Sequence, residues 1–267
     1  MKINKKITFL FLALVILAVP LCSINEKILN EDDAAKKDIT AAINNYSSDD
    51  WEIRLAAVKR AARYGDTVYA KNVILLLLLA ADDYHPIIQI EAIKNLQRIK
   101  PLAAADTLRN IALNDTDANV RYAAISALQD YASPDNEEVF TSCTSSQDWL
   151  IRESGYIGLL RIVPYDVQKK HLGKIIRGIN DDSISVRIAV LTNVKLRDPL
   201  IYNEIVKIIN NKKSGLSLLK AALSAARGYR FDKDTRERIV KLLTHRNRDI
   251  RLLSLQALKQ EKIDPSF

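Results

Sequence analysis

The feature that most constrains the fold of this 267-residue chain is a pattern that returns every 31 to 35 residues. Each copy has an aliphatic residue followed, in most copies, by arginine. We call these aliphatic residues the anchors, and they are Ile53, Ile88, Val120, Ile151, Val186, Leu218 and Ile250. A fixed period of this length is the signature of a solenoid, in which helical hairpins stack on their neighbours. The repeats therefore predict a single elongated domain.

The residues four and eight places after each anchor are mostly small or aliphatic. The first set is Ala57, Ala92, Ala124, Gly155, Val190, Ala222 and Ser254, and the second is Ala61, Leu96, Leu128, Leu159, Val194, Ala226 and Leu258. This spacing places one apolar stripe along a helix. We therefore expect each repeat to contain an outer helix, a turn and an inner helix that carries the stripe. In the second repeat these helices are expected at 67–81 and 86–99.

A short polar turn precedes each anchor and is usually acidic, as at Asp50, Asp83, Asp117, Asp148 and Asp182. Such side chains accept hydrogen bonds from the unpaired amides that open a helix. A single active site would not place carboxylates at the same turn of successive repeats. The pattern thus predicts helix caps and not catalytic acids.

Residues 1–23 have the composition of a secretory signal, because Lys2, Lys5 and Lys6 precede the apolar run 7–21. The stretch before Cys22 resembles a lipoprotein processing box, although Leu21 stands where a small residue is usual. Three outcomes stay open: lipidation of Cys22, cleavage after Ser23, or an uncleaved anchor. Residues 24–32 are expected to form a linker, 33–262 the solenoid and 263–267 a C-terminal tail.

Charge gives a weaker indication of partners. The formal net charge is +8, and removing the three lysines of residues 1–21, which contain no acids, leaves 8 − 3 = +5. A basic balance favours acidic proteins or anionic membrane surfaces. The only cysteines are Cys22 and Cys143, so no disulfide framework is expected, and Cys143 is interpreted as a buried, inert thiol.

No motif in the sequence points to catalysis. His85, His171 and His245 lie in different repeats and show no metal-binding spacing. The chain also has no glycine-rich phosphate loop and no Gly-x-Ser-x-Gly nucleophile motif. We therefore expect no metal, no cofactor and no enzymatic activity.

The segments 115–128 and 182–194 combine an acidic turn, Val-Arg and a small apolar face, and they resemble HEAT repeats, especially the short bacterial kind related to phycobilisome-lyase domains. The resemblance implies an all-α, right-handed α–α superhelix of about seven helical hairpins. It also implies a structural role, pairing with turn aspartates, for the motif arginines Arg54, Arg121, Arg152, Arg187 and Arg251. Gln89 and Leu219 replace this arginine in two repeats.

Positions six and ten after each anchor point away from the apolar stripe, at about 100° per residue, and are expected to line the concave surface. Their cations cluster in the N-terminal repeats. The sequence thus suggests a partner-binding patch of Lys59, Arg63, Lys94, Arg98 and Arg161. The alternative is that these side chains only solvate the surface and complement helix dipoles. Trp51 and Trp149 are expected either at a rim or packed on the preceding helix.

Together these features favour a non-catalytic scaffold that binds a protein partner, possibly acidic, in the periplasm or cell envelope and possibly at a membrane. One alternative is a HEAT-like lyase that acts on a chromophore or another small ligand. A nucleic-acid-binding protein is a second alternative, which export and the lack of an aromatic-basic cluster disfavour. The apolar run Val73 to Ala81 is expected to be covered, by neighbouring repeats or by a partner.

Overall fold

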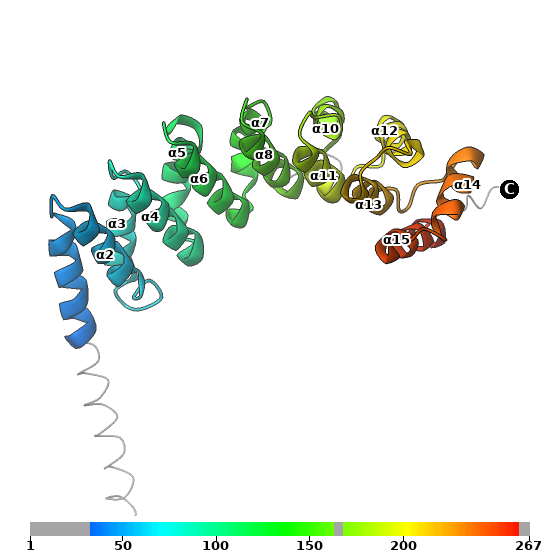
Figure 1. Ribbon diagram of the computed structural model, residues 1–267. Coiled ribbons are helices and arrows are strands. Elements are labelled where there is room, and N and C mark those ends of the chain that lie inside the picture. Colours follow the sequence, from blue (N-terminus) through cyan, green and yellow to red (C-terminus); the bar gives the residue numbers. More distant parts are fainter. Residues whose placement is uncertain (1–32, 163–167, 262–267) are drawn as a thin grey trace, which may run out of the picture. The chain divides into compact units, whose positions relative to one another are not determined.

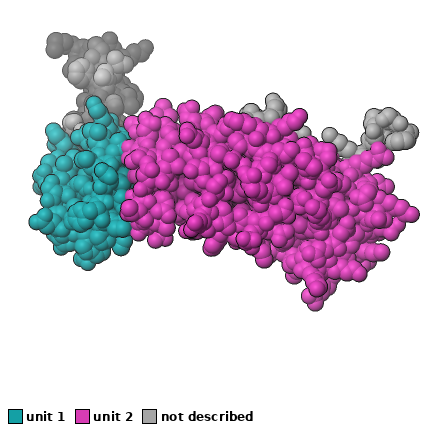
Figure 2. All heavy atoms as spheres, turned by 90° about the horizontal axis from the view of Figure 1, so that it is seen from above, with its two compact units in different colours: residues 1–101 teal, residues 102–267 magenta. Residues whose placement is uncertain are grey.

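The computed structural model describes residues 33–162 and 168–261, and all regular secondary structure in these ranges is helical. The expected signal at 1–23, Cys22, the linker 24–32 and the tail 263–267 lie outside the described residues. The chain divides into two compact units, with the boundary after Pro101 (Figure 2).

Unit 1 contains two helical hairpins. Residues 33–46 form the first outer helix, followed by α2 (Trp51–Ala62), α3 (Ala70–Ala80) and α4 (Pro86–Ile99). The two inner helices, α2 and α4, pack on one another, and α3 packs on both. Ala42, Ala57, Ala61 and Leu76 form a small core in which three alanines let the backbones approach closely.

Unit 2 continues the alternation. Its outer helices are α5 (Ala105–Asn114), α7 (Glu137–Cys143), α10 (Leu172–Ile179), α12 (Pro199–Asn210) and α14 (Lys233–Leu242). Its inner helices are α6 (Ala118–Tyr131), α8 (Trp149–Ile162), α11 (Ile184–Asn193), α13 (Leu216–Ala225) and α15 (Arg248–Lys259). Each inner helix packs on the next inner helix along the chain (Figure 1). Unit 2 is therefore a solenoid of hairpins stacked in chain order, and the predicted all-α HEAT-like fold is confirmed.

The predicted stripe forms the core. The residues four places after the anchors are buried in every described repeat, and six of the seven anchors are at most 6% exposed. Ile53 is the exception at 43%, so its predicted burial is wrong. We attribute this to its position on α2, the first inner helix in the described residues, which has no earlier inner helix to cover it.

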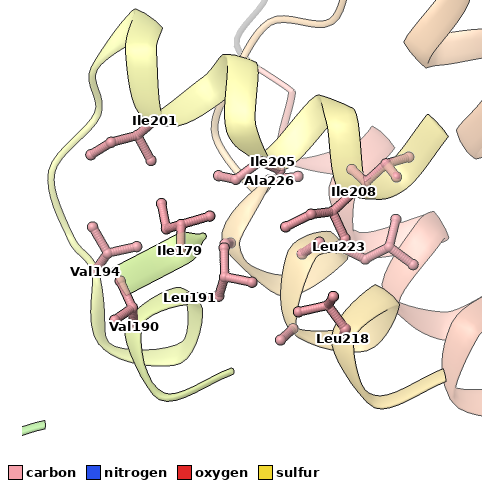
Figure 3. Close-up of a cluster of buried hydrophobic side chains, with 14 of the residues drawn as sticks. Ile179, Val190, Leu191, Val194, Ile201, Ile205, Ile208, Leu218, Leu223 and Ala226 are labelled. Atoms are coloured by element: carbon pink, nitrogen blue, oxygen red, sulfur yellow. The ribbon is translucent and has the colours of Figure 1, made fainter. Parts of the chain in front are cut away.

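In unit 2 one continuous core runs from α8 to α15. Figure 3 shows Ile179 of α10 and Val190 of α11 in the same cluster as Ile205 of α12 and Leu218 of α13. Because every hairpin hides its apolar face against the next, no hairpin has a complete core of its own.

The polar turns cap α2, α6 and α8 as expected. Asp50 accepts a hydrogen bond from the amide of Glu52 at 2.8 Å, and Asp117 accepts from Asn119 at 2.7 Å. Asp148 accepts from Leu150 at 2.9 Å. These carboxylates satisfy amides that the first helical turn leaves unpaired. At α4 and α11 the N-cap residues are His85 and Ser183, and neither accepts a first-turn amide, so the predicted caps Asp83 and Asp182 are wrong.

The prediction that position ten faces outward on the inner helix is wrong in the fifth and sixth repeats. Helices α11 and α13 end at Asn193 and Ala225, before the tenth position is reached. Leu196 consequently turns inward and is 5% exposed, while Gly228 lies in the left-handed region at φ +83°.

The apolar run on α3 is covered on one face only. Val73, Leu76 and Leu77 are buried, whereas Leu75 and Leu79 are 56% and 65% exposed. Burial of the whole run by neighbouring repeats is therefore wrong within the described residues, and cover by a partner stays a prediction.

Glycines on α8 make a close helix contact that can be tested. A Cβ atom at Gly158 would overlap the ring of Phe140 on α7, whereas at the exposed Gly173 the nearest such atom is Arg177 Nη1, at 3.9 Å. We expect Gly158→Ala to lower the free energy of unfolding by about 1–2 kcal/mol despite the better helix propensity of alanine. Gly173→Ala should raise it by up to about 1 kcal/mol. Urea unfolding measures both, and equal stabilisation by the two substitutions would contradict the packing.

Candidate functional site

The motif arginine follows five of the seven anchors directly and lies beside the hairpin turn, at a junction where the next hairpin along the chain comes close. Arg54 is 4% exposed. Its Nε and Nη2 donate to the two carboxylate oxygens of Asp83 at 2.9 and 3.1 Å, and its Nη1 donates to the carbonyls of Ser48 and Asp49 at 3.0 Å each. One guanidinium thus links its own turn to the turn of the next hairpin.

Arg152 repeats this arrangement in unit 2. It donates to both oxygens of Asp181 at 2.8 Å, and its Nη1 donates to the carbonyls of Ser146 and Gln147. Bidentate pairs of this kind fix geometry as well as contributing energy. The hydrogen bond from Arg152 holds the pKa of Asp181 below its usual value, since it outweighs the effect of burial.

Both acceptor carboxylates occupy the same place in the repeat, five residues before the next anchor. There they also accept the amide that precedes the inner helix, from His85 in one case and Ser183 in the other. Burial alone would raise the pKa of Asp83, but Arg54, the His85 amide and Tyr46 together keep it below the usual value. We call this position the closing position.

At two other junctions in unit 2 the closing position holds no carboxylate. It is Ser146 opposite Arg121, and Lys213 opposite Arg187. Arg121 still donates to the carbonyls of Asp115 and Thr116 at 2.8 and 3.2 Å. Arg187 instead donates from Nε to the carbonyl of Ile179 at 2.8 Å, and its terminal nitrogens make no hydrogen bond within the described part of unit 2.

An open pocket lies at each of these junctions. The pocket beside Arg187 has a volume of about 430 Å³ and is also lined by Lys213, Glu204 and the first turn of α13. The pocket beside Arg121 has a volume of about 300 Å³, with Ser146 and Cys143 in its wall. At both junctions where the closing carboxylate is missing, the arginine thus lines an open pocket.

The cations of the predicted patch do not form one site. Lys59 on α2, its C-cap residue Arg63 and Lys94 on α4 are exposed, and the two helices pack together in unit 1. Arg98 is held by Asp66 at 2.6 Å and by the carbonyl of Ala62 at 2.6 Å. Arg161 is exposed on α8 of unit 2, so its placement relative to the others is not defined.

Neither the two tryptophans nor the buried cysteine forms part of a reactive site in the described residues. Trp51 stacks on His85 with ring centroids 4.4 Å apart, whereas Trp149 is 48% exposed. Cys143 is buried, and this burial raises the pKa of its thiol to about 11. A thiol with such a pKa is a poor nucleophile near neutral pH.

Across residues 33–162 and 168–261, no three His, Cys, Asp or Glu side chains gather as a metal site would require. None of the helices described there combines the length and apolarity needed to cross a bilayer.

Comparison with known proteins agrees with this architecture. A family profile of HEAT repeats matches residues 73–160. An engineered protein of known structure is 18% identical, with a TM-score of 0.51 over 83% of this chain and 67% of that one. The complex of CpcE and CpcF of phycocyanin lyase from Nostoc gives 16% identity and a TM-score of 0.49 over 83% and 94%. Human deoxyhypusine hydroxylase is 12% identical, with a TM-score of 0.42 over 86% of this chain and 98% of that one.

A comparison with curated protein sequences gave no match. At 18% identity, the likeness to the engineered protein concerns the fold alone. The HEAT-repeat match covers residues 73–160, and HEAT repeats are helical hairpins that commonly mediate protein interactions.

The pair of Arg152 and Asp181 predicts a specific pH dependence. Because its folded pKa is depressed, Asp181 contributes stability above its unfolded pKa of about 3.9, and this contribution is lost as pH falls through the folded value. Asp181→Asn should lower the free energy of unfolding at pH 7 by about 2–3 kcal/mol. It should also flatten the loss of stability below about pH 4. Thermal unfolding measured from pH 7 to 3 checks both effects. An equal loss of stability below about pH 4 in the wild type and in Asp181→Asn would contradict the role of the pair.

Proposed function

We propose that this chain is a non-catalytic scaffold that binds a protein partner through the inner-helix surface of unit 1. The observation that carries the proposal is the pair of exposed lysines, Lys59 and Lys94, at the sixth position of two inner helices that pack together. Neither side chain makes a hydrogen bond or ion pair in the described part of unit 1. Both remain available to a partner.

Two neighbouring cations, Arg60 and Arg98, are already engaged in ion pairs within unit 1. Arg60 pairs with Asp38, and the pKa of Asp38 is lowered first by Arg60 and Tyr64 and more weakly by Arg63. Arg98 holds Asp66. The binding surface is therefore centred on Lys59 and Lys94, with Arg63 at its edge, and this narrows the patch that the sequence suggested.

A cationic surface of this kind favours an acidic partner. Opposite charge across an interface raises the association rate and selects the partner more than it raises affinity, and salt screens its effect. HEAT-like hairpins suit this role because stacked inner helices present an extended surface that needs no catalytic groups.

We also propose that the protein acts outside the cytoplasm. The support is the sequence of residues 1–23, with its lysines ahead of an apolar run and Cys22 at its end. The intact mass of the mature protein distinguishes the outcomes. A chain that begins at Cys22 with an added diacylglycerol and acyl group supports a lipid-tethered scaffold, and a chain that retains Met1 contradicts processing.

Charge reversal tests the binding surface. We expect Lys59→Glu with Lys94→Glu to reduce capture of the partner at least tenfold, because two attractions become repulsions, while circular dichroism and the unfolding midpoint stay unchanged. Capture is measured by cross-linking in cells, followed by quantitative mass spectrometry of the species enriched with the wild-type protein.

The matched control makes the same change in charge elsewhere in unit 1. Lys36→Glu with Lys37→Glu alters two exposed lysines on the helix 33–46. Capture should persist in this control. Equal loss in both variants would show that only net charge matters, and unchanged capture in the first variant would remove the proposed surface.

A further inference from the structure

The pocket beside Arg187 differs from the other arginine junctions of unit 2 in its charge. Arg152 is neutralised by Asp181, and Arg121 faces the neutral Ser146. At the Arg187 junction the closing position is Lys213, so Arg187 and Lys213, together with Lys207, line one pocket of about 430 Å³. Reversing the sign of the closing residue removes the internal partner of the arginine and adds a second positive charge.

The one acidic residue in this pocket neutralises neither Arg187 nor Lys213. Glu204 accepts from Lys207 Nζ at 2.7 Å and from the Asn180 side chain at 3.0 Å. The hydrogen bond from Lys207 lowers the pKa of Glu204. Glu204 and Lys207 therefore cancel, and the pocket keeps the charges of Arg187 and Lys213.

The first turn of α13 adds donors of the same kind. Its N-cap is Gly215, which has no side chain to accept the first-turn amides, and a Cβ atom there would meet no other atom within 4 Å. At α6 those amides are taken by Asp117. Unpaired amides at a helix N-terminus favour an anion, and here they open into the pocket that holds the two cations.

The pocket rim indicates what carries the anion. Ile184 and Leu216 line the pocket and are 58% and 43% exposed. Exposed apolar side chains beside two cations that lack an anionic partner in the described residues suit a peptide segment better than a free inorganic ion. At the equivalent junctions, moreover, the group that fills this place is the carboxylate of an aspartate.

We propose that this pocket binds the carboxylate of an acidic side chain from a protein partner, which takes the place of the missing closing aspartate. Arg187 supplies a two-pronged donor, Lys213 a point charge, and the first turn of α13 backbone amides. This inference extends the proposed scaffold function to a second contact, in unit 2, and rests on that function for its biological partner.

The test uses the full mature chain and blocked nine-residue peptides. One peptide has a single central glutamate flanked by leucines, and its counterpart has glutamine there. Binding is followed through the amide NMR signals of Gly215 and Ser217. We expect the glutamate peptide to bind at least tenfold more tightly than the glutamine peptide, and Arg187→Gln to abolish that preference.

Lys213→Asp separates loss of binding from loss of folding. This substitution restores the carboxylate that Asp181 provides to Arg152, so the thermal midpoint should be maintained or raised while the glutamate preference disappears. Arg121→Gln, at the singly charged pocket, should leave the preference intact.

Several results would overturn the proposal. These are equal affinity for the two peptides, a preference that survives Lys213→Asp, or binding of inorganic phosphate without binding of the glutamate peptide. Because the peptide assay does not involve Lys59 or Lys94, its failure would leave the proposed surface of unit 1 standing. Loss of capture through that surface would likewise leave the peptide result unaffected.

Discussion

The structure depends on the burial of one narrow apolar stripe per inner helix against the hairpins beside it. Alanine and glycine dominate the middle of this stripe, so the helices approach closely and the polar turns between them are brought together. Turn carbonyls crowded in this way need donors. The motif arginine supplies them, and Arg54 and Arg152 each donate to two carbonyls of their own turn.

The same arginine reaches the next hairpin, where its environment depends on a single residue. With aspartate at the closing position, the guanidinium is paired and its charge is internal to the fold. With serine or lysine there, the arginine opens onto a pocket. A residue type that stabilises the fold at one junction can thus provide a ligand site at another, without any change in backbone architecture.

Much of the fold could be predicted from the sequence, because the period and the stripe are local features. Six of the seven anchors, the caps of α2, α6 and α8 and the helical hairpins followed directly from them. End effects were less predictable: Ile53 is exposed because no earlier inner helix in the described residues covers it, and Leu196 is buried because α11 stops at Asn193. Both outcomes depend on where a helix ends in three dimensions and not on its periodicity.

The candidate sites were harder to predict for the same reason. Lys59 and Lys94 could be placed on neighbouring helices, but the tie between Arg98 and Asp66 crosses from an inner helix to a loop 32 residues earlier. The significance of Lys213 is visible only once the structure shows that Asp83 pairs with Arg54 and Asp181 with Arg152. The signal was present in the sequence, five residues before each anchor, but its meaning required the distances between hairpins.

The central claim is that the residue at the closing position decides whether the motif arginine is ion-paired within the fold or lines an open pocket. A double-mutant cycle on Arg152 and Asp181, compared with one on Arg121 and Ser146, tests this most directly. Each residue is replaced by alanine singly and together, and the free energy of unfolding is measured in urea. The account predicts a coupling energy of about 1–3 kcal/mol for the first pair and within about 0.5 kcal/mol of zero for the second. Equal coupling in the two cycles would contradict it.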